Sequence, residues 1–300
     1  MVIGTIKKCR KIFLKVFLLC FFYDILILIG VKLMKDDFKF KKSLGQNFLR
    51  DENICKKIVD SAFIDKDTLV IEIGPGSGAI SKYIIPKSGY SILYEIDTRL
   101  KDDLTEKFRD YDNYEIVFND FLKENVKEKI GRYHFKKLYV VANLPYYITT
   151  PIISKFIDDE IYPDKIVVMV QKEVALRFSA VVGSRDYGSL TVFLNYYYHI
   201  RKLFDVSRNC FEPKPNVDSA VICMELKSDR KVVNDIQLFK QLVKDSFRYK
   251  RKTIRNNLKG YDLNKISDVL NRYGFDLGVR AENLSLDIFV DIANGLCNEL

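Results

Sequence analysis

One segment combines the groups that could bind a planar base. A run of apolar residues, 138–142, ends in Asn143-Leu144-Pro145-Tyr146. The Asn143 amide oxygen is an acceptor, and Pro145 keeps Leu144 out of the helical region, so that the Leu144 and Pro145 carbonyls can point outward. Tyr146 adds an aromatic face, which suits a base whose exocyclic amine needs acceptors while its ring stacks. The alternative is an ordinary turn with an asparagine cap and a proline breaker.

Three earlier apolar segments, each typical of a buried parallel strand, also end in groups that could bind a ligand. Residues 68–73 lead into a glycine loop that contains Gly74 and Gly76, where missing Cβ atoms let a ligand lie against the backbone. Residues 91–94 end in Glu95, placed to bind ribose hydroxyls, and residues 114–118 lead to Asp120. Ligands of open α/β sheets bind beyond the carboxyl ends of strands, so the set favours one functional site.

The elements around these segments predict the fold class. We expect a helix over residues 51–63, a helical segment from residue 79, a strand over 166–171 and a helix beginning near residue 172. Residues 189–199 are β-branched and aromatic and predict a strand, and residues 220–226 predict the last strand. The pattern indicates an α/β fold, a doubly wound Rossmann-like sheet that is mostly parallel with an antiparallel last strand. A charged link, 227–231, separates a domain over residues 36–227 from a small helical C-terminal domain over residues 228–300.

A basic segment lies in the predicted C-terminal domain. Residues 243–259 predict one helix with an apolar face, and a second face carries the basic residues Arg248, Arg251, Lys252, Arg255 and Lys259. No acidic residue follows Asp245 in this segment, which favours contact with phosphates over a simply solvated face. The formal net charge of +9 agrees with a polyanionic partner.

Cysteine and histidine usage argues against a metal site. The six cysteines form no C-x-x-C pair, and His134 and His199 are the only histidines. We therefore predict no metal, no disulfide framework and a reducing compartment.

The first 35 residues differ from the rest of the chain. Basic residues precede an apolar stretch, 16–31, that is similar to a signal peptide or membrane anchor, but Asp24 interrupts it and no cleavage site follows. We interpret residues 1–35 as an apolar leader outside any domain and Met34 as the working start, and we predict no association with membranes.

The motifs 72–78, 94–97, 119–120 and 143–146, in this order, resemble those of S-adenosylmethionine-dependent rRNA adenine N6-dimethyltransferases. The resemblance spans residues 39–260 and is to the bacterial small-subunit enzymes of the KsgA type. It implies that the cofactor is S-adenosylmethionine, with Asp120 reading its adenine and Glu95 its ribose. The implied cofactor contacts are Asn47, Leu49, Gly74, Glu95, Asp120 and Asn143, to which we add Gly76 of the glycine loop.

The resemblance also implies how the substrate is held. Asn143, Leu144, Pro145 and Tyr146 hold the target adenine, and Phe211 stacks on the opposite face of the extruded base. Such stacking offsets the cost of base extrusion. The implied reaction is N6 dimethylation of two adjacent adenines near the 3′ end of small-subunit rRNA, by a cytoplasmic monomer that acts on the small-subunit precursor.

Three other functions remain open from the sequence. A DNA adenine methyltransferase usually has proline directly after the asparagine. A large-subunit rRNA methyltransferase of the erythromycin-resistance type typically has isoleucine at the position of Leu144. A ribosome-assembly factor could use the same fold to bind rRNA without catalysis.

Overall fold

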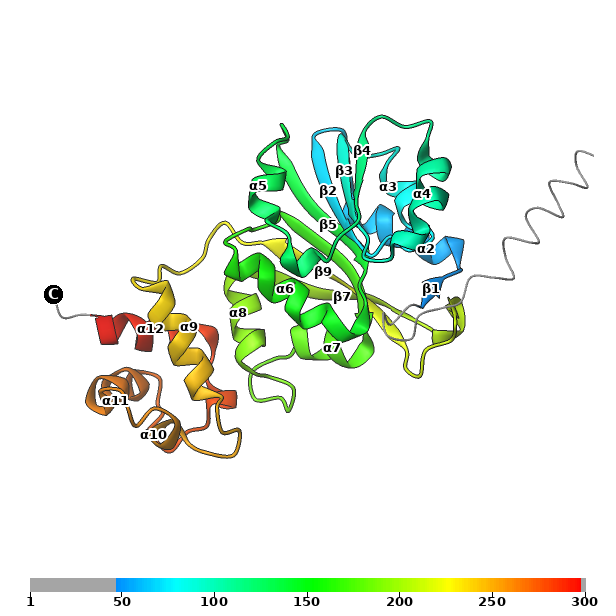
Figure 1. The fold of residues 1–300 in the computed structure, drawn as a ribbon. Helices are drawn as coiled ribbons and strands as arrows, with labels where there is room; N and C mark the ends of the chain where they lie inside the picture. Colours follow the sequence, from blue (N-terminus) through cyan, green and yellow to red (C-terminus); the bar gives the residue numbers. More distant parts are fainter. Residues whose placement is uncertain (1–46, 298–300) are drawn as a thin grey trace, which may run out of the picture. The chain divides into compact units, whose positions relative to one another are not determined.

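The computed structural model describes residues 47–297 (Figure 1). The leader, Met34 and the basic residues before Asn47 lie outside the described residues. The strands are β1 (Phe48–Leu49), β2 (Thr68–Ile73), β3 (Tyr90–Tyr94), β4 (Tyr114–Val117), β5 (Lys137–Asn143), β6 (Lys165–Gln171), β7 (Tyr198–Val206), β8 (Phe211–Glu212) and β9 (Ser219–Leu226). The α-helices are α2 (Glu52–Ala62), α3 (Ser81–Ile84), α4 (Lys101–Phe108), α5 (Val126–Ile130), α6 (Thr149–Asp158), α7 (Lys172–Phe178), α8 (Ser189–Tyr197), α9 (Ile236–Ser246), α10 (Ile254–Asn257), α11 (Leu263–Arg272) and α12 (Leu286–Cys297).

The main sheet has the strand order β4-β3-β2-β5-β6-β9-β7 within the described chain. Neighbouring strands from β4 to β6 are parallel, whereas β9 runs antiparallel to both β6 and β7. The strand order reverses between β2 and β5, which is where open α/β sheets bind ligands. The predicted fold class, with its antiparallel last strand, is confirmed.

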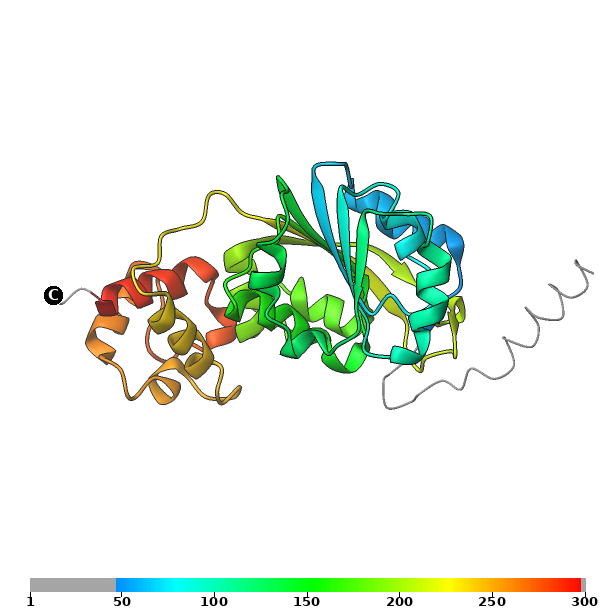
Figure 2. The same ribbon diagram turned by 45° about the horizontal axis from the view of Figure 1, so that its top comes forward.

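Helices cover both faces of the sheet (Figures 1 and 2). In β5, Val140 packs in the cluster that includes residues of α5, α6, α7 and α8, whereas its neighbour Val141 packs in the cluster that includes α2. Successive side chains of a strand point to opposite faces, so a strand buried on both faces is apolar throughout. This burial explains why the central strands β5 and β6 are continuous apolar runs in the sequence.

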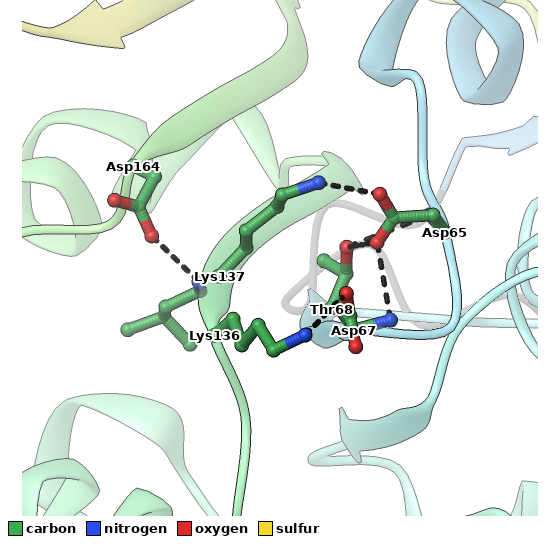
Figure 3. Close-up of polar contacts among 7 residues, drawn as sticks. Asp65, Asp67, Thr68, Lys136, Lys137 and Asp164 are labelled. Atoms are coloured by element: carbon green, nitrogen blue, oxygen red, sulfur yellow. Dashed lines mark hydrogen bonds and ion pairs between the residues drawn. The ribbon is translucent and has the colours of Figure 1, made fainter.

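Polar contacts connect β2 and β5 at their amino-terminal ends (Figure 3). Asp65, just before β2, pairs with the Lys137 ammonium and accepts a 2.7 Å hydrogen bond from the Thr68 hydroxyl. The Leu138 amide donates to Oδ2 of Asp164 at 2.8 Å. The Asp65 contacts join the start of β2 to β5, and Asp164, just before β6, joins β5 to β6.

The prediction of a strand over residues 189–199 is wrong. Residues 189–197 form helix α8, and β7 begins only at Tyr198. The helix is buried from two sides, because Leu194 packs in the cluster beneath the sheet while Val192 packs in the cluster of the C-terminal helices. A helix covered on two sides lacks a polar face, so its β-branched and aromatic composition was mistaken for a strand.

The prediction of one helix over residues 243–259 is also wrong. Helix α9 ends at Ser246, and α10 starts at Ile254 after a turn. The Ile254 amide donates to the Val279 carbonyl at 2.8 Å, and the side chain of Asn257 donates to the Ser246 carbonyl at 2.6 Å. These long-range bonds satisfy backbone groups that a continuous helix would have satisfied internally.

Helices α9 to α12 share one apolar core. That core also contains Tyr187 and Val192, which precede the charged link at residues 227–231. Lys227 of the link donates to the Asn195 carbonyl of α8 at 2.6 Å. The division at residue 228 stays a prediction, since side chains from both sides of it build this core.

Candidate active site

The glycine loop after β2 is held by a buried carboxylate. Glu95, directly after β3, is 4% exposed, and its two oxygens accept from the amides of Gly76 at 2.9 Å and Asp97 at 2.8 Å. Burial raises the pKa of Glu95. Each carboxylate oxygen has a second lone pair, so Glu95 can accept from ligand hydroxyls while it anchors the loop.

Two glycines of the loop have backbone conformations that favour glycine, and Gly76 also lacks room for a side chain. Gly74 and Gly76 have φ angles of +72° and +57°, and a Cβ on Gly76 would lie 2.6 Å from Cε1 of Phe48. Phe48 thus covers the loop beside the predicted contact residue Asn47, and the sequence analysis did not select it. Its position directly after Asn47 was the only available signal.

A second carboxyl group lies beneath the loop. Glu72, inside β2, is 1% exposed, and its Oε2 has no hydrogen-bond partner among the described residues. Burial raises the pKa of Glu72 to about 8, and the nearby Glu95 carboxylate acts in the same direction. In the sequence, Glu72 is recognisable only as the first residue of the motif 72–78. A buried carboxyl group with one unpaired oxygen beside the loop is suited to a cationic ligand, whose charge would lower its pKa.

Segment 143–146 lies beside this loop. The Leu144 amide continues the β5–β6 ladder by donating to the Met169 carbonyl at 3.1 Å. The Asn143 side-chain nitrogen donates to the Asn47 carbonyl at 3.4 Å, and a Cβ on Gly74 would lie 3.5 Å from Cγ of Pro145. The structure therefore brings the segments around residues 47, 74 and 143 together at the carboxyl edge of the sheet.

The two carbonyls expected to point outward behave differently. The Pro145 carbonyl accepts from the Ile148 amide at 3.2 Å and from the Thr149 hydroxyl at 3.1 Å, so it faces helix α6. For Pro145 the expectation is wrong, because the chain enters a helical turn immediately after this residue. The structure records no hydrogen bond to the Leu144 carbonyl from the described residues. The Leu144 carbonyl and the Asn143 side-chain oxygen are therefore the two acceptors of this segment that a ligand could use.

A hydrogen bond at its hydroxyl group holds the Tyr146 side chain in place. Its hydroxyl lies 2.6 Å from the hydroxyl of Ser219, a fully buried residue at the start of β9. Phe211 forms the short β8 strand, pairs with Leu49 of β1 and is 5% exposed. Both Leu49 and Phe211 pack in the cluster of helix α2. Sequence reasoning missed Ser219, whose role depends on a contact across 73 residues.

Asp120 lies at the same edge of the sheet. It begins a short 3₁₀ helix, where its Oδ1 accepts from the Leu122 amide at 3.0 Å, and it is partly exposed. Burial raises the pKa of Tyr147, and the charges of Asp120 and Glu95 act in the same direction.

The basic residues predicted to contact RNA are all exposed. Arg248, Arg251 and Lys252 lie in the turn between α9 and α10, Arg255 in α10, and Lys259 beyond it. Within residues 47–297, none of the five has an acidic partner within ion-pairing distance. The helix predicted for them is broken, but the five side chains remain available to an anion.

The described part of the chain has neither a cluster of metal ligands nor a membrane-spanning helix. No group of three or more His, Cys, Asp or Glu side chains there could hold a metal ion. None of the helices between residues 47 and 297 has the length and apolar character needed to cross a membrane.

The comparisons with known proteins agree with this geometry. The family model described as ribosomal RNA adenine dimethylase matches residues 37–297. The chain is 42% identical over 278 residues to the Ribosomal RNA small subunit methyltransferase A of Listeria innocua, covering 89% of this chain and 94% of that protein. It is 43% identical over 273 residues to the protein of the same name from Streptococcus pneumoniae, covering 88% and 94%.

Solved structures show the same fold. A dimethyladenosine transferase from Plasmodium falciparum aligns with a TM-score of 0.70 and 26% identity, covering 82% of this chain and 95% of that chain. The 23S rRNA methyltransferase ErmE aligns with a TM-score of 0.66 and 24% identity, covering 83% and 99%, and shows a shared fold alone. The family inferred from the motifs is confirmed: this chain belongs to the ribosomal RNA adenine dimethylase family.

Proposed function

We propose that this protein dimethylates the N6 amines of two adjacent adenines near the 3′ end of small-subunit rRNA, with S-adenosylmethionine as methyl donor. The observation that carries the proposal is the convergence of two sites at one edge of the sheet. The glycine loop anchored by Glu95 lies beside the segment 143–146. A methyl donor and an acceptor amine must meet within bonding reach, and this edge holds groups suited to each.

The residues of the loop fit the cofactor. Glu95 would accept from its ribose hydroxyls, Asp120 from its adenine amine, and the backbone of Gly74 and Gly76 would lie against it, with Asn47 and Leu49 at the rim. Leu49 is 4% exposed, so it would contribute its backbone. The cofactor supplies an electrophilic methyl group on a sulfonium.

The segment 143–146 would hold the acceptor. The amine of adenine is a poor nucleophile because its lone pair is delocalised into the ring. Acceptors at Asn143 Oδ1 and the Leu144 carbonyl would favour a pyramidal nitrogen and align the lone pair with the methyl group. The proton leaves a nitrogen that has become cationic, so no strong general base is needed.

Stacking would hold the extruded base in place. Tyr146 presents its ring at a position fixed by Ser219. Phe211 would cover the opposite face of the base. Because Phe211 is 5% exposed, this role requires its neighbours in the cluster of helix α2 to move away from the ring. Base extrusion costs a few kcal/mol, which two aromatic contacts can offset.

The remaining parts of the proposal concern the partner and its location. Arg248, Arg251, Lys252, Arg255 and Lys259 would contact rRNA phosphates, because these exposed cations have no acidic partner within the described chain. We propose that the protein acts as a monomer in the cytoplasm on small-subunit precursors, which light scattering and cell fractionation would test.

Methyl transfer to isolated ribosomal subunits tests the function. Small and large subunits from cells lacking the protein are incubated separately with labelled S-adenosylmethionine, and modified positions are mapped by primer extension. We expect label in small-subunit rRNA at two adjacent adenines near the 3′ end, and none with Asn143→Ala. Label in large subunits would instead support the erythromycin-resistance type of activity. If neither the wild type nor Asn143→Ala transfers methyl groups and both restore normal subunit assembly, the assembly-factor function is favoured.

A further inference from the structure

Tyr249 is an exposed aromatic residue in an unusually cationic turn. Its side chain is 59% exposed, between helices α9 and α10. Single exposed aromatic residues are ordinary, so exposure by itself carries no conclusion. The surroundings are distinctive: residues 246–261 contain six Lys or Arg residues and no Asp or Glu. Asp245, at the end of α9, is the nearest acidic residue before the turn. An aromatic ring in such an excess of cations is typical of surfaces that bind single-stranded nucleic acid.

The turn holds the Tyr249 backbone in place. The Tyr249 carbonyl accepts from the Lys252 amide at 2.9 Å and from the Asn257 side chain at 3.3 Å. The next residue, Lys250, donates from its ammonium to the Arg185 carbonyl at 2.8 Å. The ring is therefore presented from an ordered turn, and little conformational entropy is lost when a ligand stacks on it.

A guanidinium group lies close to the ring. The Arg248 Cζ atom is 5.8 Å from the centroid of the Tyr249 ring, within the range of a cation–π interaction. Arg248 has no ion-pair partner among residues 47–297. The Arg248 guanidinium can therefore bind a phosphate while the Tyr249 ring stacks on the base of the same nucleotide.

We propose that Tyr249 is a base-stacking residue for an unpaired nucleotide of small-subunit rRNA, distinct from the adenines that are methylated. The proposal rests on the rRNA binding put forward above and adds a contact that is independent of phosphate charge. Cations alone would bind any exposed phosphate backbone, whereas a stacking ring requires an unstacked base. Tyr249 would thus select loops or single strands over regular helices at this surface.

Three substitutions separate stacking from other roles. Affinity for small subunits is measured for Tyr249→Phe, Tyr249→Leu and Tyr249→Ala over a range of salt concentrations. We expect Phe to bind as wild type, and Leu and Ala to bind about 5- to 150-fold more weakly with an unchanged salt slope. Equal affinity of all four proteins would overturn the proposal. A Leu variant as tight as the Phe variant would also overturn it, since an apolar contact with a ribosomal protein needs no aromatic ring.

A fluorescent variant reports the contact directly. The chain contains no tryptophan, so Tyr249→Trp creates a single one. We expect small-subunit rRNA to quench its emission on binding, because a stacked base contacts the indole. The matched control is Tyr111→Trp. Tyr111 is 40% exposed and precedes the edge strand β4, whereas Tyr249 lies between helices α9 and α10. Equal responses of the two variants at saturating rRNA would refute stacking at residue 249.

Turnover distinguishes this proposal from the proposed function. At saturating small subunits, Tyr249→Ala should methylate at the wild-type rate, because the ring is outside the catalytic site. Wild-type methylation together with unchanged affinity of Tyr249→Ala would overturn the stacking role alone. Absence of methyl transfer by the wild-type protein would overturn the proposed function, whatever the affinities.

Discussion

The buried carboxyl group of Glu72 should make the stability of this protein fall as pH rises. Burial raises its pKa to about 8 in the native state, whereas a glutamate in an unfolded chain has its ordinary value of 4.5. Between these two values the native state holds a proton that the unfolded state has lost. Unfolding therefore becomes easier by about 1.4 kcal/mol for each pH unit in this interval.

The predicted slope can be measured in the upper part of that interval. From pH 6 to pH 8 the free energy of unfolding should fall by about 2 kcal/mol through Glu72 alone, and the fall should level off above pH 8. This loss is measurable against a typical domain stability of about 5–15 kcal/mol. The assay is urea unfolding at half-unit pH steps, followed by circular dichroism.

Two variants isolate the contribution of Glu72. Glu72→Gln removes the titrating group with little change in size, so its stability should lack this slope even if its absolute stability differs. Glu106→Gln is the control, because the Glu106 side chain is 70% exposed. It should keep the wild-type slope. Parallel curves for wild type and Glu72→Gln would show that Glu72 does not hold a proton at neutral pH in the native protein.

Three further predictions concern the site. Asp120→Asn keeps an acceptor for the Leu122 amide. It should weaken cofactor binding by about 1.5–3 kcal/mol, because a charged acceptor is lost. Unchanged cofactor affinity in calorimetric titration would contradict the assignment of Asp120 to the cofactor adenine. Neutralising Arg248, Lys252 and Arg255 together should lower rRNA affinity and flatten its salt dependence, with cofactor affinity as the control; a wild-type salt slope would count against phosphate contacts. Asn143→Asp removes only the long 3.4 Å donation to the Asn47 carbonyl, so the melting temperature should change little. Single-turnover methyl transfer should be lost, since aspartate keeps an oxygen but adds a charge beside the sulfonium. A near-wild-type rate would give Asn143 a purely structural role at the end of β5.

The sequence by itself determined the central strands of the sheet and the edge at which the candidate site lies. Strands buried on both faces are apolar throughout, so β2, β3, β5 and β6 were recognisable without tertiary information. Polar or glycine residues directly after such runs mark strand ends, and parallel strands place those ends together. Gly74, Glu95 and Asn143 could therefore be assigned to one edge from their order along the chain.

Only the tertiary structure decided how several segments are covered and bonded. Helix α8 is buried from two sides. Its sequence therefore lacks the alternation of an apolar and a polar face by which an amphipathic helix is recognised. The break between α9 and α10 depends on the Val279 carbonyl, which lies 25 residues beyond Ile254, and on the Asn257 side chain, which reaches back across the turn to Ser246. The contacts of Phe48 with Gly76 and of Tyr146 with Ser219 are likewise long-range. Local patterns report which side chains avoid water, whereas the partner that each backbone or polar group finds depends on where the folded chain brings distant residues.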